Sequence, residues 1–286
     1  MGRINTFAGG VLDRAGAQRT DAAWLAARRA DPAARAVVVT REGVLMAGDE
    51  PAFVGLDALG DAPELVLLGV DGVGSAIFAA DASGPYPTGE IRSLRDAAPG
   101  LAPADGGLLA QAAGLLNWHR RHRFCANCGA PTAMAEAGHV RGCPVCGAQH
   151  HPRTDPVVIM LVTREDQILL GRQASWPDRR YSALAGFVEP GESLEEAVAR
   201  EVHEEAGVRV RDVRYRSSQP WPFPASLMLG FEAGWAAGEP EVRDGELEAV
   251  GWFTAADVRD GSVLLPPRQA IARRLIDEWL ADTPDA

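Results

Sequence analysis

The sequence predicts an α/β protein, α+β in its smaller parts, that is built from two or three compact units. Three observations lead to this prediction. The chain has 286 residues, which exceeds the usual size of one domain. Apolar segments typical of strands alternate with segments of helical period. All four cysteines fall in one short window near the middle, which indicates a small separate unit there.

The composition is that of an ordinary folded protein. With 47% hydrophobic and 23% charged residues and no long biased tract, general disorder is excluded. No stretch approaches the roughly 20 apolar residues of a membrane span, and the first residues lack an apolar leader. We therefore expect a cytoplasmic protein with no membrane partner. The net charge of −11 argues against a grip on a long nucleic-acid duplex, although carboxylate-bound divalent cations can still attract a small anion.

Residues 1–118 are expected to form a small N-terminal α/β domain. The apolar runs Ala36–Val39 and Leu65–Val70 predict strands, because turn signals follow each of them. No dense set of carboxylates, histidines or cysteines stands at catalytic spacing in this part. A scaffold, a substrate lid or a dimerisation surface is therefore the favoured role.

A connecting helix is predicted from Gly107 to about Arg121, where apolar residues recur with broad helical period. It leads into the basic run His119–Arg123. This run can touch a phosphate, but a solvated helix end is the favoured interpretation.

Residues 119–152 carry the cysteines as two C-x2-C pairs: Cys125, Cys128, Cys143 and Cys146. Each such turn brings two sulfurs to one metal, so the two turns supply the four thiolates of tetrahedral zinc. Two disulfides or a thioredoxin-like redox pair are the alternatives. They are disfavoured because cytosolic thiols stay reduced and redox work needs only one pair. Four protein ligands leave no position for water, so the sequence predicts one structural Zn²⁺ per chain.

Residues 153–286 begin with three segments typical of strands, at Pro156–Val162, Gln167–Leu170 and Tyr181–Leu184. A glycine-punctuated loop follows. The next helix is well specified, because Ser193 stands at its N-cap with a glutamate three residues later, and Gly207 provides the C-terminal stop.

One face of this helix is crowded with carboxylates. Glu201, Glu204 and Glu205 stand at positions i, i+3 and i+4, where like charges repel. Hard divalent cations such as Mg²⁺ or Mn²⁺ would reverse that effect. A solvated acidic face would explain any one of these glutamates, but it does not explain the glycines and Arg200 around them.

The segment Gly186-x5-Glu192-x7-Arg200-Glu201-Val202-x-Glu204-Glu205-x-Gly207-Val208 resembles the complete Nudix box. The resemblance implies an α/β/α sandwich in which this loop-helix-loop holds divalent metals. It also implies hydrolysis of a nucleoside diphosphate linked to another group. The box covers only residues 186–208 and specifies a reaction class rather than a substrate.

A second motif, Ser218-Gln-Pro-Trp-Pro-Phe-Pro-Ala-Ser226, follows the box. Prolines that alternate with aromatic residues make a stiff extended loop, whose rings either stack on a base or simply pack, and the residues alone leave both open. The motif resembles the array that marks the NAD(H) pyrophosphatase branch of the Nudix enzymes, the NudC-type proteins. The order of N-terminal domain, ribbon, box and array is similar too, so the resemblance covers nearly the whole chain.

The resemblance to this branch implies a function and partners. The enzymes release nicotinamide mononucleotide and AMP from NAD(H), and some bacterial members remove NAD caps from RNA 5′ ends. It makes a homodimer plausible, and one interpretation of residues 1–118 is a non-catalytic Nudix-like domain.

The resemblance also assigns roles by position. It implies that Glu201, Glu205, Glu246 and the carbonyl of Ala185 bind Mg²⁺ or Mn²⁺, with Glu204, Glu205 and Glu246 as candidates to accept the proton of the attacking water. The implied substrate contacts are Phe187, which stacks on the substrate, Arg95, Ala272 and the loop residues Gln219, Pro220, Trp221, Pro222, Phe223, Pro224, Ala225 and Ser226. His151 departs from the pattern, because the family often has a tyrosine there that holds a substrate ring, and Gly138 replaces a polar contact of some relatives.

Two other functions stay open at this point. A broader Nudix hydrolase of ADP-ribose or dinucleoside polyphosphates has the same box. A nucleotide-sensing or RNA-binding protein without catalysis can have the same fold and ribbon. For a capped RNA, the acidic charge predicts that the cap and the first nucleotide are read, with little grip on the RNA body.

Overall fold

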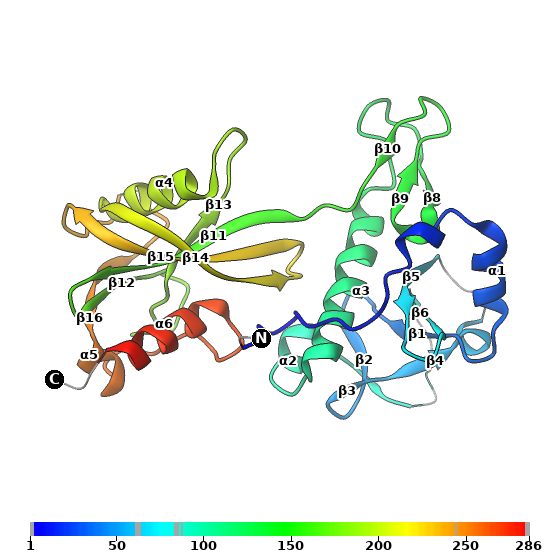
Figure 1. Cartoon of the computed structure of the whole chain (residues 1–286), viewed down its shortest axis with the longest axis horizontal. Helices are drawn as coiled ribbons and strands as arrows, with labels where there is room; N and C mark the ends of the chain where they lie inside the picture. The colour runs from blue at the N-terminus through cyan, green and yellow to red at the C-terminus, as the bar shows by residue number, and fades with distance from the viewer. Residues whose placement is uncertain (1–2, 61–63, 83–85, 87, 244, 284–286) are drawn as a thin grey trace. The chain divides into compact units, whose positions relative to one another are not determined.

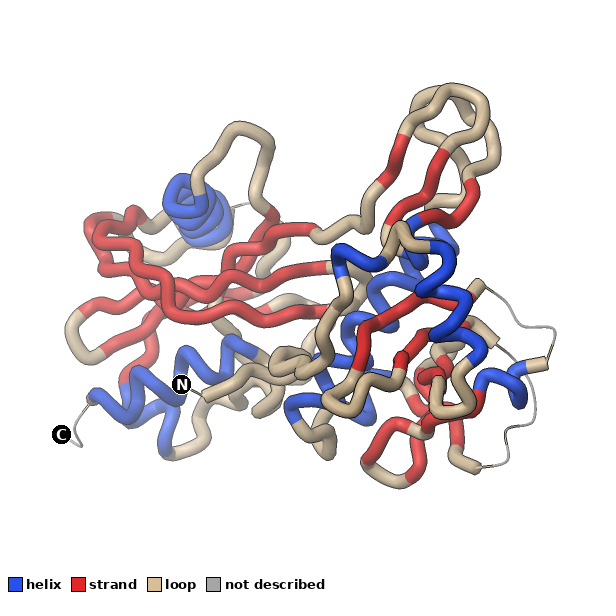
Figure 2. The backbone as a smooth tube through the Cα atoms, turned by 45° about the vertical axis from the view of Figure 1, so that its right-hand side comes forward, coloured by secondary structure: helices blue, strands red, loops and turns tan. Residues whose placement is uncertain are grey.

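The computed structural model describes residues 3–60, 64–82, 86, 88–243 and 245–283. The chain divides into two compact units (Figures 1 and 2). The first comprises residues 1–154 with 220–225, and the second comprises residues 155–219 with 226–286. The N-terminal domain and the cysteine segment, for which we expected separate units, lie together in the first. Within the described residues, no helix is long and apolar enough to cross a membrane.

The first unit contains a four-stranded sheet of order β4-β1-β6-β5 and a three-stranded sheet of order β3-β2-β7. The pair β1 and β6 is parallel, and the other pairs of the larger sheet are antiparallel. The long helix α3 packs on β5 and β6. The elements are α1 (Ala22–Ala30), β1 (Arg35–Val38), β2 (Val44–Ala47), β3 (Glu50–Pro51), β4 (Phe53–Gly55), β5 (Leu65–Val70), β6 (Ala76–Ala80), β7 (Glu90–Arg92), α2 (Leu94–Ala97) and α3 (Pro103–Arg121), with short 3-10 turns at Gly16–Gln18 and Leu56–Leu59.

The cysteine segment forms a small antiparallel sheet of order β10-β9-β8, with β8 at Ala133–Ala135, β9 at Val140–Gly142 and β10 at Gln149–His150. A 3-10 turn, η3 (Glu136–Gly138), packs this sheet against β5. The packing of this turn explains why glycine stands at position 138. Its φ is +96°, and a Cβ there would lie 2.8 Å from a methyl group of Val66. This close packing leaves no room for a side chain at position 138.

The second unit is built on a mixed sheet of order β14-β15-β11-β12-β16, with β13 paired to β11. Only the β11 and β15 pair is parallel among these neighbours for which a register is given. The elements are β11 (Asp155–Arg164), β12 (Gln167–Arg172), β13 (Leu184–Phe187), α4 (Leu194–Ala206), β14 (Arg209–Trp221), β15 (Ser226–Ala237), β16 (Ala249–Thr254), α5 (Ala255–Arg259) and α6 (Ile271–Asp282).

Helices cover both faces of this sheet, as Figure 1 shows. Successive side chains of a strand point to opposite faces. In β11, Val158 and Met160 therefore pack with the apolar stripe of α4, whereas Ile159 and Leu161 pack with α6. The second unit is thus the α/β/α sandwich that the box implied.

The structure corrects two expectations. The strand predicted at Tyr181–Leu184 lies later, at Leu184–Phe187, because these residues pair with β11 while Ser182 makes only an isolated bridge to Gly171. The solvated helix end expected at His119–Arg123 is wrong for His119. That side chain is buried, and its Nε2 lies 2.8 Å from the carbonyl oxygen of Gly138.

Candidate active site and zinc site

Local signals at both ends define helix α4. Ser193 Oγ accepts a hydrogen bond from the backbone N–H of Glu196, and the Glu196 carboxylate accepts one from the N–H of Ser193. This reciprocal capping satisfies two donors that a helix start leaves open. Gly207 closes the helix in the left-handed conformation, with φ +70°. The predicted helix is confirmed, and its buried apolar stripe fixes which way the glutamates point.

The carboxylate of Glu201 lies directly over the backbone of Gly186, at the end of β13. A Cβ on Gly186 would fall 1.8 Å from the carboxyl carbon of Glu201 and about as close to both oxygens. Real Cβ atoms never approach other atoms so closely. Glycine at this position therefore makes the space that the Glu201 carboxylate occupies.

Arg200 connects the acidic residues of the box. Its guanidinium binds both oxygens of Glu192, at 2.6 Å and 3.0 Å, and donates to the carbonyl oxygen of Phe187 at 2.9 Å. It also reaches Glu201 at 2.8 Å and Glu204 at 3.0 Å. The Arg200 guanidinium and the N–H of Glu189 lower the pKa of Glu192 to about 2. The loop is thereby tied to the helix by paired charges.

The remaining glutamates differ in exposure. Glu205 is only 4% exposed and is the one buried carboxylate among the described residues, whereas Glu204 and Glu246 are exposed. Glu201 is intermediate. Burial of the Glu201 carboxylate raises its pKa, and the negative charges of Glu204 and Glu246 raise it further. Arg200 acts in the opposite direction and lowers this pKa. Glu246, which the sequence placed beyond the box, therefore lies close enough to act electrostatically on Glu201.

These residues fit a hard divalent cation. They are carboxylates, which hard cations prefer as ligands, and the charges of Glu204 and Glu246 act on Glu201. Arg200 pairs with three carboxylates of the box, those of Glu192, Glu201 and Glu204. The carboxylates are spread more widely than the thiolates of the ribbon. Among the described residues, those thiolates form the one group whose ligand atoms all lie within 4.8 Å of one another.

Strand β13 carries two further predicted residues. Ala185 pairs with Ile159 of β11 in the sheet. Phe187 is 60% exposed at the end of the strand, beside the loop that Arg200 fixes. A large apolar ring left in solvent at this place is available for a ligand, and its stacking on substrate stays a prediction.

The proline-aromatic segment comprises the end of β14, the turn at residues 222–225 and the first residue of β15. Gln219, at its start, is 1% exposed, and its side-chain amide donates to the carbonyl oxygen of Gln269 and accepts from the N–H of Ile271. Both ends of this amide are therefore used to hold the start of α6, where Ala272 is also buried. The residues alone did not indicate this positioning role, because it depends on a contact fifty residues away.

The two rings of the segment pack inside the first unit. Trp221 and Phe223 lie 5.1 Å apart edge to face, and the ring of Phe7 lies 6.0 Å and 5.7 Å from them. The guanidinium of Arg95 stands 3.9 Å from the Phe223 ring and 5.5 Å from that of Trp221. Of the two interpretations left open by the sequence, packing is present, and the structure brings Arg95 together with the loop. Base stacking stays a prediction.

The remaining loop residues flank these rings in the sequence: Pro220, Pro222, Pro224, Ala225 and Ser226. The carbonyl oxygen of Pro224 accepts a hydrogen bond of 3.5 Å from Asn117. His151 is exposed in the irregular segment after β10, so its imidazole can reach a ligand from solvent.

The four predicted zinc ligands converge. The sulfurs of Cys125, Cys128, Cys143 and Cys146 all lie within 4.8 Å of one another. The two turns have the same form, because Gly129 and Gly147 each have a positive φ and donate to the first cysteine's carbonyl oxygen. Backbone N–H groups of Cys146 and Val145 help to lower the pKa of Cys143 to about 6. The convergence of four sulfurs from two matched turns suits structural zinc.

The sequence analysis missed a neighbour of this site. Nε2 of His150 lies 3.2 Å from the sulfur of Cys125. His150 lies four residues after Cys146 in the sequence. It was not predicted as a neighbour of the zinc because the two cysteine pairs already supply four ligands. A second layer of hydrogen bonds around ligands commonly orients them.

We expect Cys128→Ser to release the zinc and to lower the unfolding temperature by about 10 °C, because metal binding by such a site is folding free energy. Metal analysis and thermal unfolding of the full chain measure both effects. Ala126→Ser, an exposed change in the same turn, is the control. Stoichiometric zinc and unchanged melting in Cys128→Ser would show that the thiolates do not hold a metal.

Three family models match the chain along its length. They are described as an NADH pyrophosphatase-like rudimentary NUDIX domain at residues 21–118, an NADH pyrophosphatase zinc ribbon domain at 120–150 and a NUDIX domain at 153–279. The last contains the carboxylate helix, and the second contains the four cysteines.

Curated relatives match nearly end to end. The NAD-capped RNA hydrolase NudC of Mycobacterium bovis is 41% identical, with 95% of both chains covered. The protein of the same name from Stutzerimonas stutzeri is 42% identical over 76% of this chain and 80% of its own length. That from Deinococcus radiodurans is 39% identical over 85% and 86%.

Proposed function

The chain belongs to the NudC family of Nudix hydrolases, and from this membership we propose that it hydrolyses the pyrophosphate bond of NAD(H) and of NAD-capped RNA 5′ ends. The observation that carries the proposal is the near end-to-end match to NAD-capped RNA hydrolases, together with an intact box in which the Glu201 carboxylate lies over Gly186. The products are nicotinamide mononucleotide and AMP, or nicotinamide mononucleotide and a 5′-monophosphate RNA.

Glu201, Glu205, Glu246 and the carbonyl of Ala185 are the residues that would hold Mg²⁺ or Mn²⁺. When bound, such ions would neutralise charge on the diphosphate and lower the pKa of a water, so that the water can lose a proton and attack phosphorus. Arg200 keeps Glu201 and the loop residue Glu192 in place through its paired hydrogen bonds. The exposed carboxylates Glu204 and Glu246 remain able to accept the proton of the attacking water.

We propose that aromatic rings recognise the substrate: the exposed ring of Phe187 and the half-buried rings of Trp221 and Phe223. The Phe187 ring stands in solvent and offers its face to a base. Trp221 and Phe223 are held at fixed angles by Phe7 and Arg95, which presents a preformed surface rather than a flexible loop. A preformed site binds its ligand at lower entropic cost.

The setting of the enzyme follows from the same family membership. We propose a cytoplasmic homodimer, since reduced thiols suit a zinc tetrathiolate and two-fold assemblies are the commonest oligomers. Gel filtration with light scattering tests the dimer. A mass of one chain, 30.3 kDa, would contradict it.

A substrate panel tests the proposed reaction. Purified protein with Mg²⁺ or Mn²⁺ is given NADH, NAD⁺, ADP-ribose and NAD-capped RNA in separate reactions, and products are separated by chromatography. We expect nicotinamide mononucleotide from NAD⁺ and NAD-capped RNA and its reduced form from NADH, and cleavage of ADP-ribose at least about tenfold slower, because it lacks the nicotinamide ring. Preferential ADP-ribose cleavage would favour the broader hydrolase. Tight RNA binding without turnover would favour a non-catalytic role.

A further inference from the structure

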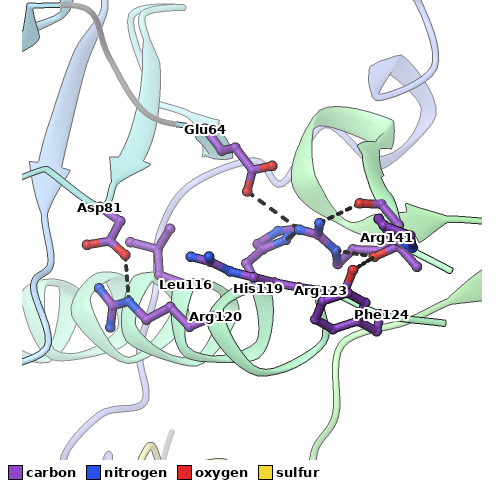
Figure 3. Close-up of a pocket in the computed structure, with 10 residues that line it drawn as sticks. Glu64, Asp81, Leu116, His119, Arg120, Arg123, Phe124 and Arg141 are labelled. Atoms are coloured by element: carbon purple, nitrogen blue, oxygen red, sulfur yellow. Dashed lines mark hydrogen bonds and ion pairs between the residues drawn. The ribbon is translucent and has the colours of Figure 1, made fainter. Parts of the chain in front are cut away.

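A cavity of about 580 Å³ lies in the first unit, and none of its lining residues belongs to the carboxylate helix (Figure 3). This volume is within the usual range for small-ligand sites. The cavity is formed by the end of α3, the two residues before Cys125, the ribbon and two acidic residues of the N-terminal domain. Its lining is Glu64, Asp81, Leu116, His119, Arg120, Arg123, Phe124, Pro131, Thr132 and Arg141. No role proposed so far uses it.

One wall of the cavity is fixed by a buried polar network. Arg141 is 4% exposed, and it donates to the hydroxyl and the carbonyl oxygen of Thr132, each at 2.8 Å. It also lies 2.9 Å from Nδ1 of His119. Burial lowers the pKa of His119, so the ring is neutral near pH 7 and its Nδ1 accepts from Arg141 while its Nε2 donates to Gly138. A fully hydrogen-bonded wall keeps its shape when a ligand enters.

The lining carries more positive than negative charge. Arg120 is paired with Asp81 at 2.6 Å, and Arg141 lies 3.5 Å from Glu64. Arg123 is the third arginine, and its guanidinium has no acidic partner in the described part of the chain. Figure 3 shows its side chain reaching into the cavity. In a chain with a net charge of −11, this local excess favours an anionic ligand.

Phe124, directly after Arg123, presents a flat apolar face at the same opening. It is 66% exposed, which leaves a large apolar surface in water. A simple anion would not use this ring, and an apolar ligand would not use Arg123. Nearby, Glu64 and Asp81 retain exposed oxygens that can accept hydrogen bonds from the exocyclic amines of a base.

We propose that this cavity binds a nucleotide, with its phosphate at Arg123 and its base stacked on Phe124. The mixed lining matches the two halves of such a ligand, since a phosphate takes arginine donors and a base takes an aromatic face and acceptors. The nucleotide is either free or part of an RNA strand. The inference rests on the first unit alone and does not depend on the proposed hydrolysis.

Binding of AMP and of a short 5′-hydroxyl oligoadenylate to the zinc-loaded full chain tests this site. Calorimetric titrations are run without added divalent metal, so that no turnover is needed. We expect Arg123→Ala and Phe124→Ala each to weaken binding about tenfold. Arg121→Ala is the matched control, because Arg121 is also exposed at this helix end but does not line the cavity, and it should change affinity less than twofold.

The outcomes separate the sources of the nucleotide and the two sites. Variant-sensitive binding of AMP supports a site for free nucleotides, and such binding of the oligoadenylate alone supports a site for RNA. If Glu205→Gln weakens binding and the cavity variants do not, the probe binds at the catalytic site and the proposal is overturned. The proposal is also overturned if neither probe binds. Zinc content and melting temperature of each variant must match those of the wild type. We expect this match because Arg123 and Phe124 are exposed, so their substitution removes little packing.

Discussion

Replacing Glu205 with glutamine should reduce NAD(H) hydrolysis by at least about a thousandfold, an effect of roughly 4 kcal/mol on the barrier. Glutamine has nearly the same shape, so the packing of this buried side chain is kept. The negative charge that a divalent cation needs is lost. Initial rates of nicotinamide mononucleotide release at saturating Mn²⁺, with melting temperature and circular dichroism on the same samples, measure the effect.

Glu195→Gln is the matched control for this experiment. Glu195 is a glutamate of the same helix, lies in its first turn and is exposed. The same chemical change there should leave the rate within about twofold, since surface substitutions have small effects. A Glu205→Gln enzyme that folds and retains near-wild-type turnover would remove Glu205 from the catalytic assignment.

Local signals in the sequence were sufficient to predict helix α4, which carries the box glutamates. The capping pair Ser193 and Glu196, the apolar stripe and the stop at Gly207 all act within a few residues, so α4 is where it was predicted. The same holds for the two cysteine turns, because each is complete within five residues. The sandwich followed from the resemblance of the box, and the alternation of β11 between two cores agrees with it.

Contacts between distant segments could not be predicted in this way. His119 looked like part of a solvated basic run, and only the ribbon, nineteen residues later, buries it against Gly138. Gln219 looked like part of a binding loop, and its partners lie in the segment that begins α6. In both cases one polar side chain satisfies groups of an element that no local pattern connects to it.

The cavity of the first unit could not be predicted from the sequence either. Arg123 and Phe124 were visible as neighbours in the sequence, but their significance depends on Glu64, Asp81 and Arg141, which come from three other segments. Tertiary packing decides which of many exposed arginines faces a hollow and which faces open solvent.

Gly186→Ala should lower the hydrolysis rate about a hundredfold and the free energy of unfolding by about 1–3 kcal/mol. The new methyl group would occupy the position of the Glu201 carboxylate, 1.8 Å from its carboxyl carbon. Either the carboxylate rotates away or strand β13 moves, and displacement of a catalytic group by about 1 Å is enough for such a loss. Steady-state kinetics with NADH and denaturant unfolding measure the two effects separately.

The matched control is Gly251→Ala in β16 of the same sheet, where the nearest atom to a new Cβ is 3.8 Å away, an ordinary contact. It should leave activity near the wild-type value. A double variant Gly186→Ala with Glu201→Ala separates the two causes, because removing the carboxylate relieves the overlap. We expect the double variant to regain stability without regaining activity. If it is no more stable than Gly186→Ala alone, the overlap with Glu201 is not the source of the destabilisation.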